Sequence, residues 1–366
     1  MLIYIPFLQS IFSWYHYSPK RVRGLEYEAA LLEESLAHFG GIQQCRWIAS
    51  NRRALQSLKT NYKSTCSHLQ NIVENIPKDA PKAGRLLRKL RSPKFITFLQ
   101  FMIDLSSIIS SLSLMFQAND LLIIDVLPII ETTMLKLIEM KSIPGDNISS
   151  IVHGFEYDGV LLTGPVEPEL QQLHIKIIDS AVSQIDARFK VFQQSPITDF
   201  AVLDYRQWPH EICELAVYGR KQIENLVKHF APVLTEEEVE GVVKEFTSFK
   251  VHVTKLRTSS PKIVFRDLLL MPPESCKNFM ALVEIMMTIS TSTAVVERGF
   301  SHMNIVKSST RTLLGNDTLN NLLEIKLNGE SIKEFNPDEA IVHWLNTGSK
   351  MRHINGHKSK NKEKEV

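Results

Sequence analysis

Side chains that could act on a phosphate gather between Thr291 and Gly329. Glu297 offers a carboxylate that can ligate a divalent cation, while Arg298, Lys307 and Arg311 supply nearby positive charge. Two-metal phosphoryl transfer needs several carboxylates around its cations, so Glu297 would require acidic partners. Without partners, the alternative interpretation is an exposed helix glutamate.

A second candidate pair is Arg46 and Trp47, which precede a long helical pattern. An indole ring can stack on an unpaired base while a neighbouring guanidinium neutralises phosphate. The alternative is a tryptophan packed at the start of a helix. The sequence alone leaves both interpretations open.

Two helices are expected to position the residues from 291 to 329. In the first, Val296, Phe300 and Met303 recur at helical spacing. The second begins with Asn316 or Asp317 as its N-cap and stops at Asn328-Gly329. Its apolar stripe consists of Leu319, Leu322, Leu323 and Leu327, with Ile325 on the flank. Such apolar helices must be buried against their own domain or a second copy of the chain.

The motif Glu297-Arg-Gly-Phe-Ser301 is followed by Lys307, Arg311 and Leu313 and then by the leucine-rich helix. This combination resembles the C-terminal dimerisation region of hAT-superfamily DNA transposases. The resemblance implies a ribonuclease-H-like fold in which Glu297 corresponds to the third acid of a catalytic triad. It also implies that Trp47 corresponds to a base-stacking tryptophan of the inserted helical domain. The partners implied are a second copy or a related hAT-derived protein, and DNA, in the nucleus.

The other two acids of such a triad are expected to be missing, with the chain beginning downstream of them. Asp125 is the one internal replacement, in a run that would have to be a strand, but Pro128 and the helical periodicity beyond it favour a helix. We therefore expect no catalytic residue, with Glu297 as a vestigial acid. No cofactor or metal is expected, and Mg²⁺ would bind only to an intact triad.

The composition is that of an ordinary globular protein: 366 residues with a formal net charge of +2. Four cysteines are scattered without zinc-binding spacing, and we expect them to be reduced thiols. The segment 95–116 is the only membrane candidate, but its polar stripe with Gln100 and Asp104 favours a buried helix, so no membrane partner is expected.

The fold predicted is mainly α, a helical insertion domain plus the C-terminal helices of an incomplete ribonuclease-H-like fold. The domains expected are 1–77, the N-terminal helical segment; 78–262, the helical insertion; 263–349, the dimerisation region; and 350–366, a disordered basic tail. Helices are predicted over 25–39, 50–76, 95–116, 121–140, 169–193, 211–230, 236–256 and 274–289. Residues 144–168, rich in Gly and Pro, are expected to form a long loop or a pair of short extended pieces.

These observations predict a transposase-derived protein dimerisation module that is not an enzyme, with residual DNA binding through Arg46, Trp47, Arg298, Lys307 and Arg311. Phe300, Leu313, Leu319, Leu322, Leu323 and Leu327 are the predicted dimerisation or core residues. The alternatives are the C-terminal part of an active hAT transposase with metal-dependent strand transfer, and a helical scaffold protein.

Overall fold

The computed structural model describes residues 4–40, 47–118, 121–143, 145–146, 156–164, 170–308, 310–311 and 313–347. It confirms that the protein is mainly α. The described residues form helices and one antiparallel ribbon of two short strands, β1 (Glu156–Tyr157) and β2 (Val160–Leu161). The chain divides into two compact units, an N-terminal unit, Met1–Thr293, and a C-terminal unit, Ala294–Val366. The domain boundaries expected after residues 77 and 262 stay predictions.

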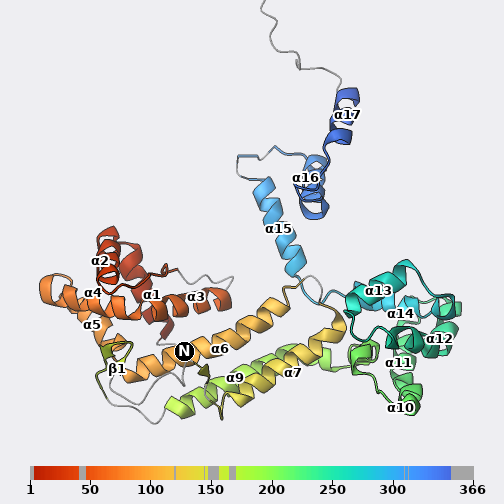
Figure 1. Ribbon diagram of the computed structural model, residues 1–366, viewed down its shortest axis with the longest axis horizontal. Helices are drawn as coiled ribbons and strands as arrows, with labels where there is room; N and C mark the ends of the chain where they lie inside the picture. The colour runs from red at the N-terminus through yellow and green to blue at the C-terminus, as the bar shows by residue number, and fades with distance from the viewer. Residues whose placement is uncertain are drawn as a thin grey trace, which may run out of the picture. The chain divides into compact units, whose positions relative to one another are not determined.

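Five helices, coloured red to orange in Figure 1, enclose the first hydrophobic cluster of the N-terminal unit. Trp14, Tyr62 and Leu69 at its centre are fully buried. Ser18 and Pro19 separate the first two helices, and Pro19 is the first residue of α2. The helices are α1 (Tyr4–His16), α2 (Pro19–Leu31), α3 (Trp47–Thr60), α4 (Tyr62–Asn75) and α5 (Ala80–Leu90).

Two predicted helix boundaries in this region are wrong. The helix expected over 25–39 starts at Pro19 and ends at Leu31, and residues 34–40 are irregular. The helix expected over 50–76 is interrupted at Asn61, which is fully buried. The Asn61 side chain donates to the Ala37 carbonyl at 2.6 Å and accepts from the Ala37 amide at 2.8 Å. These two long-range hydrogen bonds hold the irregular segment in place. The periodicity of the sequence does not predict them.

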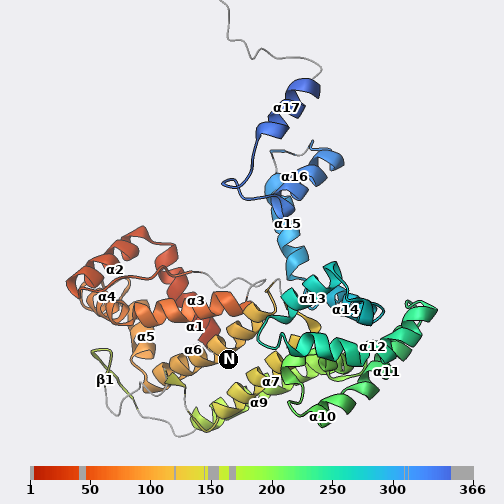
Figure 2. The same cartoon turned by 45° about the vertical axis from the view of Figure 1, so that its right-hand side comes forward.

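The long helix α6 (Pro93–Met115) lies beside α7 (Ile123–Glu139) and α9 (Leu170–Phe189), as Figures 1 and 2 show. One face of α6, including Phe95 and Leu99, belongs to the first cluster. Another face, including Phe98 and Phe101, packs in a cluster with residues of α7 and α9. This double burial explains its apolar composition. By length and hydropathy α6 is the one candidate membrane span among the described residues, and 61% of its most apolar window is buried.

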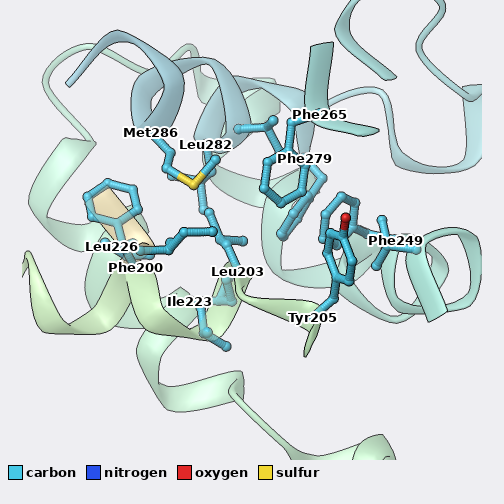
Figure 3. Close-up of a cluster of buried hydrophobic side chains, with 14 of the residues drawn as sticks. Phe200, Leu203, Tyr205, Ile223, Leu226, Phe249, Phe265, Phe279, Leu282 and Met286 are labelled. Carbon is cyan, nitrogen blue, oxygen red and sulfur yellow. The ribbon is translucent and has the colours of Figure 1, made fainter. Parts of the chain in front are cut away.

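The largest cluster fills the C-terminal half of the N-terminal unit, and Figure 3 shows its centre. Phe249 and Phe279 stack with ring centroids 4.2 Å apart, and Tyr205 meets Phe265 edge to face. Trp208 donates its indole N–H to the Val202 carbonyl at 2.7 Å. The elements around this cluster include α7, η2 (Thr198–Leu203), η3 (Tyr205–Gln207), α11 (Arg220–Phe230), α12 (Glu236–Thr254), α13 (Pro261–Leu270) and α14 (Met280–Thr288).

Two of the predicted C-terminal helices are broken in the structure. The helix expected over 211–230 is two helices, α10 (Ile212–Val217) and α11, separated at Gly219 with φ of +77°. The helix expected over 274–289 consists of the 3₁₀ turn η4 (Glu274–Cys276) and α14. By contrast, α12 begins at Glu236 as predicted, behind a capping box: the Thr235 hydroxyl accepts from the Glu238 amide, and Glu238 accepts from the Thr235 amide.

Candidate self-association surface

The first helix of the C-terminal unit, α15 (Ala294–Val306), carries the predicted motif. Val296 and Phe300 are four residues apart and therefore share a face, and both are more than half exposed. Met303, one turn further on, is half-buried. The Ser301 hydroxyl donates to the Glu297 carbonyl at 3.0 Å, a local bond within the helix. The predicted apolar stripe therefore exists and its first two members face solvent.

The second helix, α16 (Asn316–Asn328), packs against α15. Its N-cap is Gly315 rather than the predicted Asn316 or Asp317, and it stops at Gly329 as expected. Its leucine stripe is graded in exposure: Leu319 is buried, Leu322 and Leu323 are half-buried, and Leu327 is 49% exposed. Ile325, on the flank, is 68% exposed. The stripe therefore contacts α15 in part and leaves apolar surface open.

A third helix, α17 (Asp338–Thr347), was not predicted. Asn336 accepts from the Asp338 amide at 3.1 Å, and Asp338 and Glu339 occupy the first turn. Pro337 followed by two acids is a helix-start signal that sequence reasoning could have used. Trp344 is 62% exposed, and its neighbours Ile341 and Val342 are about half exposed. These three residues add exposed apolar side chains outside the predicted site.

The described residues of the C-terminal unit bury a single hydrophobic side chain, Leu319. We call the exposed apolar side chains of this unit the apolar surface. They contain no nucleophile or acid, so their chemistry is that of binding another apolar surface. The apolar surface consists of Val296, Phe300, Ile305, Leu313, Ile325, Leu327, Ile332, Phe335, Ile341, Val342 and Trp344.

Glu297 is exposed in the first turn of α15. Within the described part of the chain, no group of three or more His, Cys, Asp or Glu side chains is placed to hold a metal ion. Asp125 lies in the first turn of α7, as the helical interpretation predicts. Its carboxylate accepts from the Arg206 guanidinium at 2.6 Å and from the Leu122 amide at 3.3 Å. The expectation of no catalytic residue stays a prediction.

The predicted DNA-contacting residues are distributed over both units. Lys307 and Arg311 are exposed and Arg298 is half-buried, all in the C-terminal unit. Trp47 is the first residue of α3 in the N-terminal unit, but its side chain lies outside the described residues, as does all of Arg46. Among the predicted dimerisation residues, Phe300 and Leu313 are 57% and 99% exposed, which makes them available to a partner.

The remaining side chains with reactive potential are thiols. Cys66 and Cys276 are buried and Cys213 is exposed, and all three are free. Burial raises the pKa of the Cys66 thiol to about 12, which keeps it protonated at neutral pH. Cys45 lies outside the described residues. The two buried thiols are thus core residues.

No protein-family model matches the chain, and no solved structure matches it at a significant level.

Proposed function

We propose that the protein is a transposase-derived self-association module in which helices α15 to α17 pair with a second copy of the chain. The motif around Glu297 supports this origin through its resemblance to the hAT C-terminal dimerisation region. In this proposal α15 and α16 correspond to C-terminal helices of a ribonuclease-H-like fold. In this proposal the module works in the nucleus and performs no strand transfer itself, because the resemblance implies that the other two acids of the triad lie outside this sequence.

The observation that carries the proposal is the near absence of a core in the C-terminal unit. Its helices have 13, 13 and 10 residues, lengths at which an isolated helix is marginal in water. Helices of this length are stabilised by packing an apolar face, and here Leu319 alone is buried among the described residues. A partner that covers Phe300, Ile325 and Trp344 would supply the missing burial, at roughly 25 cal/mol per Å² of apolar surface.

A second copy fits this surface better than an unrelated partner because the surface can complement itself. Two-fold pairing places the same apolar faces against each other, which is the commonest arrangement of homo-oligomers. The unit also carries charges of both signs. Asp338 and Glu339 form an acidic helix start, and Lys307 and Arg311 form a basic segment. A two-fold axis can therefore set opposite charges at the rim of an apolar interface.

The test replaces two exposed members of the apolar surface, one on α15 and one on α16. Phe300→Ser combined with Ile325→Lys removes two side chains that are 57% and 68% exposed. The molar mass measured by light scattering after size exclusion should fall from that of a dimer to 41.8 kDa. Leu322→Glu with Leu323→Glu should also give monomers, but would additionally disturb α16, because both leucines are half-buried.

The matched control is Leu135→Lys on α7, which removes a side chain of equal exposure, 67%, from the N-terminal unit. It should leave the mass of the dimer unchanged. A double variant that stays dimeric, or a control that dissociates equally, would contradict pairing through α15 and α16.

A further inference from the structure

The dipeptide Ser-Pro occurs four times in the chain, and three copies continue into the same tripeptide, Ser-Pro-Lys. Their serines are Ser18, Ser92 and Ser260. Each stands directly before a helix that begins with the proline, and none of the three hydroxyls caps its helix. Serine and proline are ordinary helix-start residues, whereas a lysine in the first turn opposes the helix dipole. The tripeptide is therefore explained only in part by helix initiation.

The three copies differ in the link that holds the serine. Ser18 and Ser92 lie in links of two residues, 17–18 and 91–92, between consecutive helices, and both serines are half-buried. Ser260 ends a link of six residues, 255–260, between α12 and α13, and it is exposed. An enzyme that binds an extended peptide must open a helix end at the first two copies, but meets an irregular segment before the third.

The backbone at Ser260 is already extended. Its φ of −64° and ψ of 129° lie in the region that a following proline favours. The link is anchored through its other residues: the Ser259 carbonyl accepts from the Tyr205 hydroxyl at 2.9 Å, and Arg257 donates to the Pro209 carbonyl at 2.7 Å. Ser260 is therefore an exposed side chain on a link that is held in place by its neighbours.

The charges around Ser260 favour an anionic group. Residues 255–266 contain four cations and no acid. The fourth Ser-Pro copy has the opposite setting, because the Ser195 hydroxyl donates to the Asp199 carboxylate at 2.6 Å. A phosphate on the Ser195 oxygen would lose this hydrogen bond and meet a like charge, whereas one at Ser260 would be surrounded by positive charge.

We infer that Ser260 is a phosphorylation site for a proline-directed protein kinase. The Ser260 Oγ attacks the γ-phosphorus of ATP, so that an Oγ–P bond forms while the bond from this phosphorus to the β,γ-bridging oxygen breaks and ADP leaves. The hydroxyl proton passes to the catalytic aspartate of the kinase. A proline at the next position has no amide N–H that the kinase would have to satisfy. The inference is independent of self-association.

A phosphate at Ser260 should strengthen the start of α13. This helix buries Val264 and Phe265 in the largest cluster, so its first turn belongs to the folded core. Phosphoserine carries a charge of about −1.5 to −2, which the helix dipole attracts at the N-cap. The same charge offsets the unfavourable position of Lys262 in the first turn.

The experiment incubates the full chain with Mg-ATP and a purified proline-directed kinase of the cyclin-dependent class, and maps the phosphate over time by tandem mass spectrometry. Each rate is divided by that of a synthetic peptide with the same sequence, which removes any sequence preference of the kinase. The ratio at Ser260 should exceed those at Ser18 and Ser92 by at least about tenfold, because the short links must first unfold locally. Ser260→Ala should abolish the fast reaction.

The matched control is Ser259→Ala, which removes the exposed neighbouring hydroxyl that no proline follows. It should react like the unmutated chain, and circular dichroism should show both variants to be folded. Calorimetry of the singly phosphorylated chain should give a thermal midpoint higher by roughly 1–3 °C.

Three results would overturn the inference at the level of the site: no phosphate on the peptide of Ser260, no phosphate on the chain when that peptide reacts, or a higher ratio at Ser18 or Ser92. Loss of the reaction in Ser259→Ala would assign the phosphate to the neighbouring residue instead. A midpoint that stays the same or falls would contradict the stabilisation of α13.

Discussion

His68 links three helices of the N-terminal unit through one buried ring. Its Nδ1 lies 3.1 Å from the Tyr15 hydroxyl, and its ring rests against Gly24 of α2, where any Cβ would overlap Nε2. Burial lowers the pKa of His68 and outweighs the opposing effect of Glu28, while Arg21 lowers the pKa further. The neutral ring is therefore the form that the folded chain accommodates.

Acidification should consequently destabilise the N-terminal unit. The unfolded chain binds a proton at His68 near pH 6.5, whereas the folded chain binds it only at lower pH. Stability is thus complete above the unfolded pKa and is lost as the pH falls below it. The thermal unfolding midpoint should be lower at pH 5.0 than at pH 7.5. His68→Gln should reduce this difference, and an undiminished difference in that variant would exclude His68 as its source. Burial also lowers the pKa of His174, so His174 should account for the pH dependence of stability that remains in the His68→Gln variant.

At the scale of elements, the junction between α10 and α11 depends on a single backbone conformation. Gly219 adopts a φ of +77°, and a Cβ there would overlap the Cγ2 of Val202 in the core. At the same junction, the ammonium of the buried Lys250 donates to the carbonyls of Leu215 and Tyr218, each at 2.7 Å. These bonds satisfy the carbonyls at the end of α10.

Gly219→Ala should therefore lower the free energy of unfolding by about 1–3 kcal/mol, because it combines a strained conformation with a steric overlap. Urea unfolding followed by circular dichroism measures the change. Gly40→Ala is the control, since a Cβ at Gly40 meets nothing within 4 Å, and it should shift stability by less than about 0.5 kcal/mol. A similar loss in both variants would argue against the overlap with Val202.

The elements that could be predicted from sequence are those specified locally. Helices α6, α7 and α12 follow from periodicity. The break at Asn61 could not be predicted, because it depends on Ala37, a partner far along the chain. The break at Gly219 has a local signal, a glycine inside the expected helix, which periodicity does not register. The apolar stripes of α15 and α16 were predictable for the same local reason. Their exposure was not, since periodicity does not show what covers a face.

At the scale of the whole molecule, the two units differ in what their surfaces offer. The N-terminal unit buries many of its apolar residues in three clusters and presents charged faces such as that of α5. Among its described residues, the C-terminal unit buries Leu319 alone and presents apolar side chains from α15, α16 and α17. A chain built in this way has one part that folds around its own core and another whose burial needs a partner.

Sedimentation equilibrium of the full, unmutated chain tests the need for a partner most directly. Over loading concentrations from about 0.5 to 50 μM, mass action predicts an apparent mass that rises with concentration towards twice 41.8 kDa and then stays constant. An apparent mass of 41.8 kDa at every concentration would contradict self-association through α15 to α17.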